Sequence, residues 1–180
     1  MAYFTTRDLA AISLSSSLWA IINWLVSPVF WSMTRLPILC DMLGVSSLII
    51  TAWWVRKPGS TAFVGFIATL LNFILQPGAN QFLGFTAASV FFDMTLSILN
   101  YGKTVEGGIK SNIILMIVSA AATLLAGYII GNLFLAPEVL NNVYGNLFLF
   151  AGVHMVGGII GAVIGIAIIR SLETRMVVPK

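Results

Sequence analysis

Six long apolar runs, separated by short polar or Pro/Gly-rich segments, constrain the fold of this chain more than any other feature. They lie at roughly 8–27, 38–55, 60–76, 83–101, 110–134 and 145–170. A helix needs about 20 mostly apolar residues to cross the hydrocarbon core of a bilayer. Most of the runs meet this length, and those at 38–55 and 60–76 are somewhat short. The sequence therefore predicts a single membrane domain, residues 1–180, with six transmembrane helices.

Two other fold classes conflict with the composition. A soluble domain carries about 25% charged residues, whereas this chain is 59% hydrophobic and 8% charged. A membrane β-barrel alternates polar and apolar residues over about ten positions, whereas these runs are continuous and rich in Leu, Ile, Ala and Gly. We therefore expect an all-α integral membrane bundle. Its only cysteine, Cys40, excludes an internal disulfide and a multi-cysteine metal site.

The basic residues predict the orientation of the bundle. With six spans, Arg35 falls on one side of the membrane. The other Lys and Arg residues all fall on the opposite side: Arg7, Arg56, Lys57, Lys103, Lys110, Arg170, Arg175 and Lys180. Because cytoplasmic segments carry the excess of Lys and Arg, we expect both termini in the cytoplasm and a multi-pass protein of the plasma membrane. Residues 27–37, 76–82 and 136–144 would then lie outside.

Strongly polar side chains within the runs gather toward the predicted outer side. Asp41, Asn72 and Asn146 lie near outer helix ends. At 1.5 Å of rise per residue, Asp93 and His154 lie about 13–15 Å below the outer boundary, near the midplane. The cytoplasmic half carries few hydrogen-bonding groups apart from hydroxyls and residues at helix ends. This distribution predicts a polar cavity that is open to the outside and closed toward the cytoplasm.

Each of these polar residues also has a structural interpretation. Asp41 is either a site residue or the first-turn acid that caps its helix. Asp93 either faces the cavity or forms a structural hydrogen bond, with His154 or Asn72 as the partner. His154 is either an interior group with its hydrogen bonds satisfied or a ligand-binding group. Asn72 and Asn146 either contact substrate or join helices.

Two further segments suggest contacts with a ligand or a protein. The segment 27–37 contains two prolines, Trp31 and Arg35, which predicts a lid over a small-molecule pocket; the alternative is an interfacial aromatic belt. In the first helix, Ala11 and Ser15 are four residues apart, a spacing that allows close approach of another helix, either within the bundle or from a partner. The glycines at 157, 161 and 165 form a similar ridge, for internal packing or a homodimer.

The chain carries no motif of a membrane enzyme. It has no HExxH, GxSxG or GxGD motif and no P-loop. Asp41 and Asp93 differ in predicted depth by about 10 Å, which is too far for an aspartyl dyad. We therefore expect no enzymatic activity, no cofactor and no nucleic-acid partner. Transport against a gradient would need energy from another subunit.

The chain resembles the substrate-binding S components of energy-coupling factor (ECF) transporters. The likeness lies in its length, in Thr6-Arg7-Asp8 before a small-residue first helix, in the long segment between the first two helices, and in Gly65, Gly78 and Gly84-Phe85. The resemblance implies an outward-facing vitamin site and a complex with a transmembrane coupling subunit and two ATPase subunits. It also implies that Ala11 and Ser15 contact the coupling subunit. Metal-transporting relatives carry a His near the N-terminus, so the start Met1-Ala2-Tyr3 argues against nickel or cobalt.

The sequence thus predicts a capture subunit for a small water-soluble vitamin or its precursor. Intramembrane acids favour a cationic or amine-bearing ligand, such as thiamine or its pyrimidine, whereas Arg35 equally suits an anion. The predicted substrate-binding residues are Asp93, Asn72, His154, Asn146, Trp31, Arg35 and Asp41. The alternatives are a self-sufficient channel or secondary transporter, homodimeric through the glycine ridge, and a non-transporting assembly protein of the membrane.

Overall fold

The computed structural model describes residues 3–177, and within this range the chain is all-helical, without a strand. The elements are α1 (Thr6–Thr34), α2 (Ile38–Val55), α3 (Ser60–Leu75), α4 (Phe82–Ile98), α5 (Tyr101–Thr104), α6 (Ile109–Leu133), α7 (Pro137–Val139), the π-helical turn η1 (Leu140–Tyr144) and α8 (Leu147–Thr174). The predicted fold class, an all-α bundle, is confirmed.

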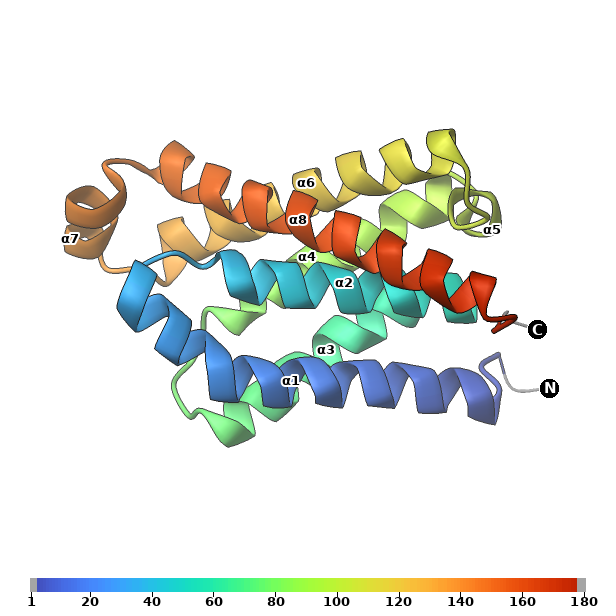
Figure 1. The fold of residues 1–180 in the computed structure, drawn as a ribbon. Helices are drawn as coiled ribbons and strands as arrows, with labels where there is room; N and C mark the ends of the chain where they lie inside the picture. Colours follow the sequence, from blue (N-terminus) through green and yellow to red (C-terminus); the bar gives the residue numbers. More distant parts are fainter. Residues whose placement is uncertain (1–2, 178–180) are drawn as a thin grey trace.

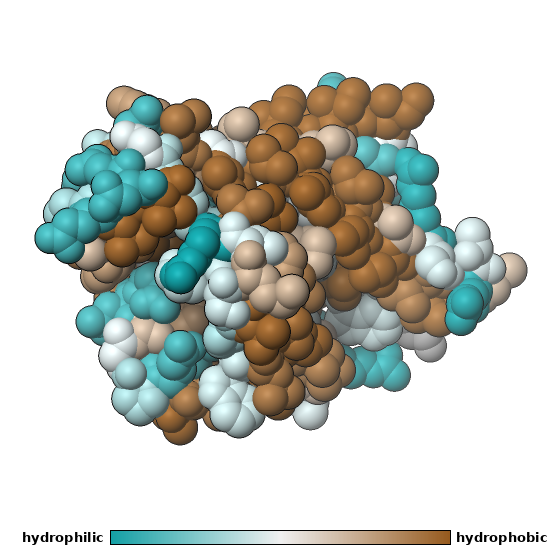
Figure 2. Space-filling view, turned by 60° about the vertical axis from the view of Figure 1, so that its left-hand side comes forward, coloured by the Kyte–Doolittle hydropathy of each residue, from teal (hydrophilic) through white to brown (hydrophobic). Residues whose placement is uncertain are grey.

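Four helices are long and apolar enough to cross a membrane: α1, α2, α6 and α8. The helices α3 and α4 are also apolar but shorter, at 16 and 17 residues. Hydrophobic residues cover much of the side of the bundle, and hydrophilic residues gather toward the end that carries α7 (Figure 2). Such a surface is compatible with a membrane protein, because lipid tails require an apolar exterior.

The six longer helices run along a common axis, and both ends of the chain lie at the same end of the bundle, opposite α7 (Figure 1). The helix α8 packs between α2 and α6, and α4 packs between α3 and α6. The helix α1 packs against α2 and α3. This arrangement leaves one side of α1 exposed, where Leu14 and Leu18 are 62% and 51% exposed.

The glycine ridge of α8 packs within the chain, against α2. A Cβ atom at Gly157 would lie 2.9 Å from Asp41 Cβ, and one at Gly161 would lie 2.7 Å from the Met42 carbonyl oxygen. Contacts this short require glycine, because they leave no room for a methyl group. The ridge therefore joins α2 to α8 and is not a free surface for a homodimer.

The predicted lid over 27–37 is wrong as a loop, because α1 continues through Pro28 to Thr34. Proline lacks an amide hydrogen and clashes with the carbonyl four residues earlier, which bends a helix without having to end it. Figure 1 shows α1 bending in this region. The helix ends at Arg35, whose φ is 58°, and only Arg35, Leu36 and Pro37 separate it from α2.

The fourth predicted helix is also shorter than expected. It ends at Ile98, followed by Asn100 with a φ of 69°, and Tyr101 begins the separate short helix α5. The Asn100 side chain accepts a hydrogen bond from the Lys103 amide and so caps α5. Asp93 lies in the second half of α4, where it contacts Gly59 and Thr61 at the start of α3.

Candidate functional site

A cavity of about 410 Å³ lies toward the end of the bundle opposite the chain termini. Its volume falls in the range of about 300–1,000 Å³ that is typical of small-molecule sites. The lining comes mainly from α1, α2, α4, α6 and α8 and from the segments that connect them. These residues are Asn23, Ser27, Pro28, Phe30, Trp31, Leu36, Pro37, Leu39, Cys40, Asp41, Gln76, Gln81, Phe82, Phe85, Ala126, Ile130, Phe134, Leu135, Tyr144, Phe150 and His154.

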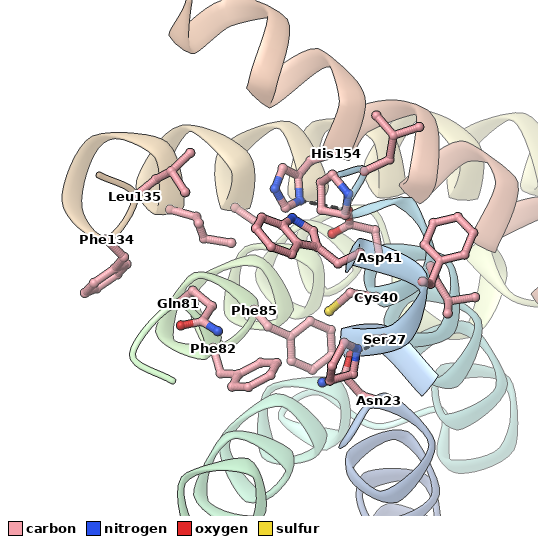
Figure 3. A pocket seen from close by; sticks show the side chains of 18 of the residues that line it. Asn23, Ser27, Cys40, Asp41, Gln81, Phe82, Phe85, Phe134, Leu135 and His154 are labelled. Carbon is pink, nitrogen blue, oxygen red and sulfur yellow. Dashed lines mark hydrogen bonds and ion pairs between the residues drawn. The ribbon is translucent and has the colours of Figure 1, made fainter. Parts of the chain in front are cut away.

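The wall of this cavity brings together Asp41, in the first turn of α2, and His154 of α8 (Figure 3). Asp41 Oδ2 lies 2.7 Å from His154 Nδ1, and the two residues are 6% and 3% exposed. Two glycines allow this approach. Gly157 lets α8 reach the backbone beside Asp41, and a Cβ atom at Gly127 of α6 would lie 2.8 Å from His154 Cδ2.

One nitrogen of this pair has no partner. Asp41 Oδ2 and His154 Nδ1 lie at ion-pair distance and are each other's partner. Among the described residues, His154 Nε2 has neither a hydrogen-bond nor an ion-pair partner. Buried polar atoms nearly always have a partner, because an unpaired one loses its hydration without compensation. This nitrogen, beside the Asp41 carboxylate, therefore marks the place where the cavity can bind a polar group.

Aromatic side chains surround the polar pair. Phe85 stacks on Trp19, with ring centroids 4.1 Å apart, and Trp19 Nε1 donates a hydrogen bond to the Cys40 carbonyl oxygen at 3.2 Å. Phe150 packs edge-to-face against both Tyr144 and His154, with centroids 4.7 Å apart in each pair. These contacts fix the rings that face the cavity.

Amide side chains supply further polar groups at the cavity surface. Asn23 lines the cavity and donates to Asn72 Oδ1 at 3.3 Å, while Asn72 Nδ2 donates to the Ala68 carbonyl at 2.8 Å. Asn72 is fully buried and is not among the lining residues. It therefore joins α3 to α1 and holds Asn23 in place, which is the helix-joining role that the sequence left open.

Trp31 lines the cavity, whereas Arg35 is exposed and is not among the lining residues. The guanidinium carbon of Arg35 is 4.5 Å from the centre of the Trp31 ring, a cation–π contact. The Tyr144 hydroxyl donates to the Arg35 carbonyl oxygen and thus ties the end of α1 to η1. Burial raises the pKa of Tyr144, so its hydroxyl keeps the proton that it donates.

The structure places Asn146 outside the cavity lining, as the N-cap of α8. Its side chain accepts a hydrogen bond from the Leu149 amide at 2.9 Å, and the residue is exposed. An N-cap oxygen satisfies one of the amide groups that have no partner within the first turn of a helix. This local hydrogen bond explains the position of Asn146 without a ligand.

Asp93 also lies apart from the cavity, contrary to the expectation that it faces the outer site. Its carboxylate accepts hydrogen bonds from the Gly59 amide at 2.6 Å, from the Thr61 amide and hydroxyl at 3.1 and 2.7 Å, and from the Tyr101 hydroxyl at 3.2 Å. It thus caps the N-terminus of α3 from a neighbouring helix. Burial and the Asp93 charge raise the pKa of Tyr101, so its hydroxyl remains a donor.

Ala11 and Ser15 are half-buried on the side of α1 that faces the bundle. Ala11 packs against the hydrophobic core, and Ser15 Oγ accepts a hydrogen bond from Thr51 Oγ1 of α2 at 2.8 Å. Part of the small-residue face is therefore used for packing within the chain. Ser13, two residues away, is exposed.

Sequence reasoning missed most of the aromatic lining, including Phe82, Phe85, Tyr144 and Phe150. Phenylalanine in a membrane helix gives no signal for a site, because it is equally common facing lipid. Of the predicted substrate-binding residues, the structure brings Trp31, Asp41 and His154 to the cavity. No group of three or more His, Cys, Asp or Glu side chains able to hold a metal ion occurs within residues 3–177.

Comparison of the chain with protein families, with curated proteins and with solved structures gives no match.

Proposed function

We propose that this chain is the membrane substrate-capture subunit of an ATP-driven ECF transporter, binding a small water-soluble vitamin or vitamin precursor in the cavity. The observation that carries the proposal is the buried pair of Asp41 and His154, with His154 Nε2 unpartnered among the described residues, at the wall of an aromatic-lined cavity of about 410 Å³. A protein that only supported membrane assembly would have no need for an unsatisfied polar atom at such a cavity.

In the proposed topology, the protein crosses the plasma membrane six times, with both termini in the cytoplasm. At 1.5 Å per residue, α3 and α4 measure about 24 and about 26 Å, slightly less than the hydrocarbon core of about 30 Å. Short spans are accommodated by local thinning of the bilayer. In this orientation the excess of basic residues lies in the cytoplasm and the cavity faces outward.

A channel or a self-sufficient transporter has less support. Side chains such as Leu48, Ile49 and Trp53 are 0–1% exposed and pack the half of the bundle that bears the chain termini. A solute that entered the cavity would meet this packed half, so release on the other side needs a rearrangement of the protein. We propose that a coupling subunit and two ATPase subunits drive this rearrangement.

Co-purification from the native membrane tests the proposal. A tagged chain is expected to retain ATPase subunits, and vesicles that contain the complex are expected to accumulate solute only with ATP. If solute accumulates without ATP and no ATPase subunit is retained, the proposal is wrong.

A matched pair of variants tests the partner surface on α1. Ser13→Trp adds bulk to the exposed side of α1, next to Leu14, whereas Ile113→Trp adds it to an exposed position of α6. We expect only Ser13→Trp to lose the ATPase subunits, with both variants still binding solute. If both variants retain the ATPase subunits equally, the small-residue face of α1 is not the partner surface.

A further inference from the structure

The cavity lining holds one carboxylate, paired with a histidine, and no lysine or arginine. Asp41 is the only Asp or Glu among the lining residues, and none of them is Lys or Arg. Arg35 is exposed, stacks on the Trp31 ring and is not among the lining residues. A negatively charged ligand would therefore approach the Asp41 carboxylate with no lining Lys or Arg to compensate, in a site where water screens poorly.

The surface of the cavity favours a flat ring. Rings of Trp31, Phe82, Phe85 and Phe150 contribute to its walls, and each is held by a further aromatic or cation–π contact. Aromatic rings attract a planar ligand by stacking and attract a cation through their electron-rich faces. The same rings offer nothing to a phosphate group.

We infer that the ligand is a flat nitrogen-containing ring. It carries one positive charge or, instead of that charge, an amine that donates a hydrogen bond, and it has neither a phosphate nor a carboxylate group. This inference rests on the proposed function, because it names the class of solute that the same cavity captures. It rests on the juxtaposition of Asp41 and His154 at the wall of a cavity that has no Lys or Arg in its lining.

Such a ligand would complete the hydrogen bonding of the pair. An N–H or cationic group of the ligand donates to the Asp41 carboxylate, and the charge-assisted hydrogen bond stabilises the complex more than a neutral one. A neutral imidazole has one donor and one acceptor nitrogen, so His154 can pair with a second polar atom of the same ring. Gln81, which is exposed, supplies an amide group for a substituent of the ligand.

The test is a binding series in which charge varies while shape is held nearly constant. The purified full-length chain is titrated with 1-methylnicotinamide, nicotinamide and nicotinate, which are cationic, neutral and anionic, and with thiamine and thiamine monophosphate. We expect the cation to bind at least tenfold more tightly than nicotinate, and thiamine at least tenfold more tightly than its phosphate. The readout is quenching of tryptophan fluorescence, checked by equilibrium dialysis.

Variants test whether Asp41 causes the preference for cationic ligands. Asp41→Asn keeps the size of the side chain but removes the charge, and we expect the preference for cations to disappear. Asp93→Asn removes a buried charge away from the cavity, and Glu138→Gln removes an exposed one, so both should keep the preference. The inference is overturned if nicotinate binds as tightly as the cation, if Asp41→Asn keeps the preference, or if no compound of the series binds.

The capture function and the ligand class are distinguished by different outcomes of these experiments. ATP-dependent uptake together with a preference for anions would contradict the ligand class and leave the capture function in place. Binding of cations by a chain that has no ATPase partner would contradict the transporter and leave the ligand class in place.

Discussion

Two buried aspartates in this bundle differ because of the backbone that faces them. Asp93 is surrounded by donors, since the first turn of α3 and the Tyr101 hydroxyl all point at its carboxylate. Asp41 faces a cavity and pairs with a histidine instead of backbone donors, since its Oδ2 atom lies 2.7 Å from His154 Nδ1. Asp93 therefore stabilises the fold, whereas Asp41 is the aspartate that we propose binds the ligand.

The substitution Asp93→Asn separates these roles. An amide offers one acceptor oxygen where the carboxylate has two, so at least one donor of α3 loses its partner. We expect the free energy of unfolding to fall by about 1–3 kcal/mol, while solute affinity stays unchanged. Thermal unfolding and solute titration of the same sample measure both quantities. A loss of affinity at an unchanged melting temperature would place Asp93 in the site after all.

At the scale of helices, the hydropathy of the sequence predicts the all-α bundle and most helix bounds to within a few residues. It does not predict the path of α1 beyond Pro28, because proline ends some helices and only bends others, depending on what packs beside it. The end of α4 at Ile98 was missed for a similar reason: the break at Asn100 lies between apolar residues.

The pairing of Asp41 with His154 could not be derived from helix depth alone. Their distance depends on how closely α2 and α8 approach, which is set by Gly157 beside Asp41. The glycine ridge was visible in the sequence, but the helix that it packs against was not. Similarly, the tight hydrogen bonding of Asp93 depends on the position of the α3 N-terminus relative to α4.

Packing of α6 against α8 gives a prediction at the same scale. A Cβ atom in Gly127→Ala would lie 2.8 Å from both Ala151 Cα and His154 Cδ2, so α8 or His154 must move. We expect the free energy of unfolding to fall by about 1–3 kcal/mol, together with a weaker affinity for solute.

Gly152→Ala is the matched control for this substitution, because a Cβ atom at position 152 of α8 would meet nothing within 4 Å. Alanine favours a helix over glycine by about 0.5–1 kcal/mol, so this variant should be at least as stable as the parent chain. Chemical unfolding of both variants checks the comparison. Equal stability of the two would contradict the close packing at Gly127.

The whole molecule has a packed end and a hollow end. Near the chain termini, the Lys57 ammonium lies 2.6 Å from the Asp8 carboxylate, and Trp53 Nε1 donates to Glu173 at 3.0 Å, so α1, α2 and α8 are joined there. The cavity lies toward the opposite end. A bundle of this form suits a solute that enters from one side of a membrane.

Labelling of Cys40 tests which side that is. Cys40 is the only cysteine of the chain and lines the cavity. In intact cells, we expect a membrane-impermeant maleimide to label it, and bound solute to slow the reaction. Glu106→Cys in a Cys40→Ser background places the thiol in the exposed segment between α5 and α6, which should react only after permeabilisation. The reverse pattern would invert the proposed orientation.

Solute capture at Asp41 and His154 is the central claim, and mass spectrometry of small molecules released from the purified chain tests it most directly. The parent chain is predicted to release a small cationic or amine-bearing ring compound in near-stoichiometric amount, and Asp41→Asn is predicted to release little or none. The account would be contradicted if the parent chain released no solute and remained empty after incubation with a set of water-soluble vitamins, or if Asp41→Asn released as much as the parent chain.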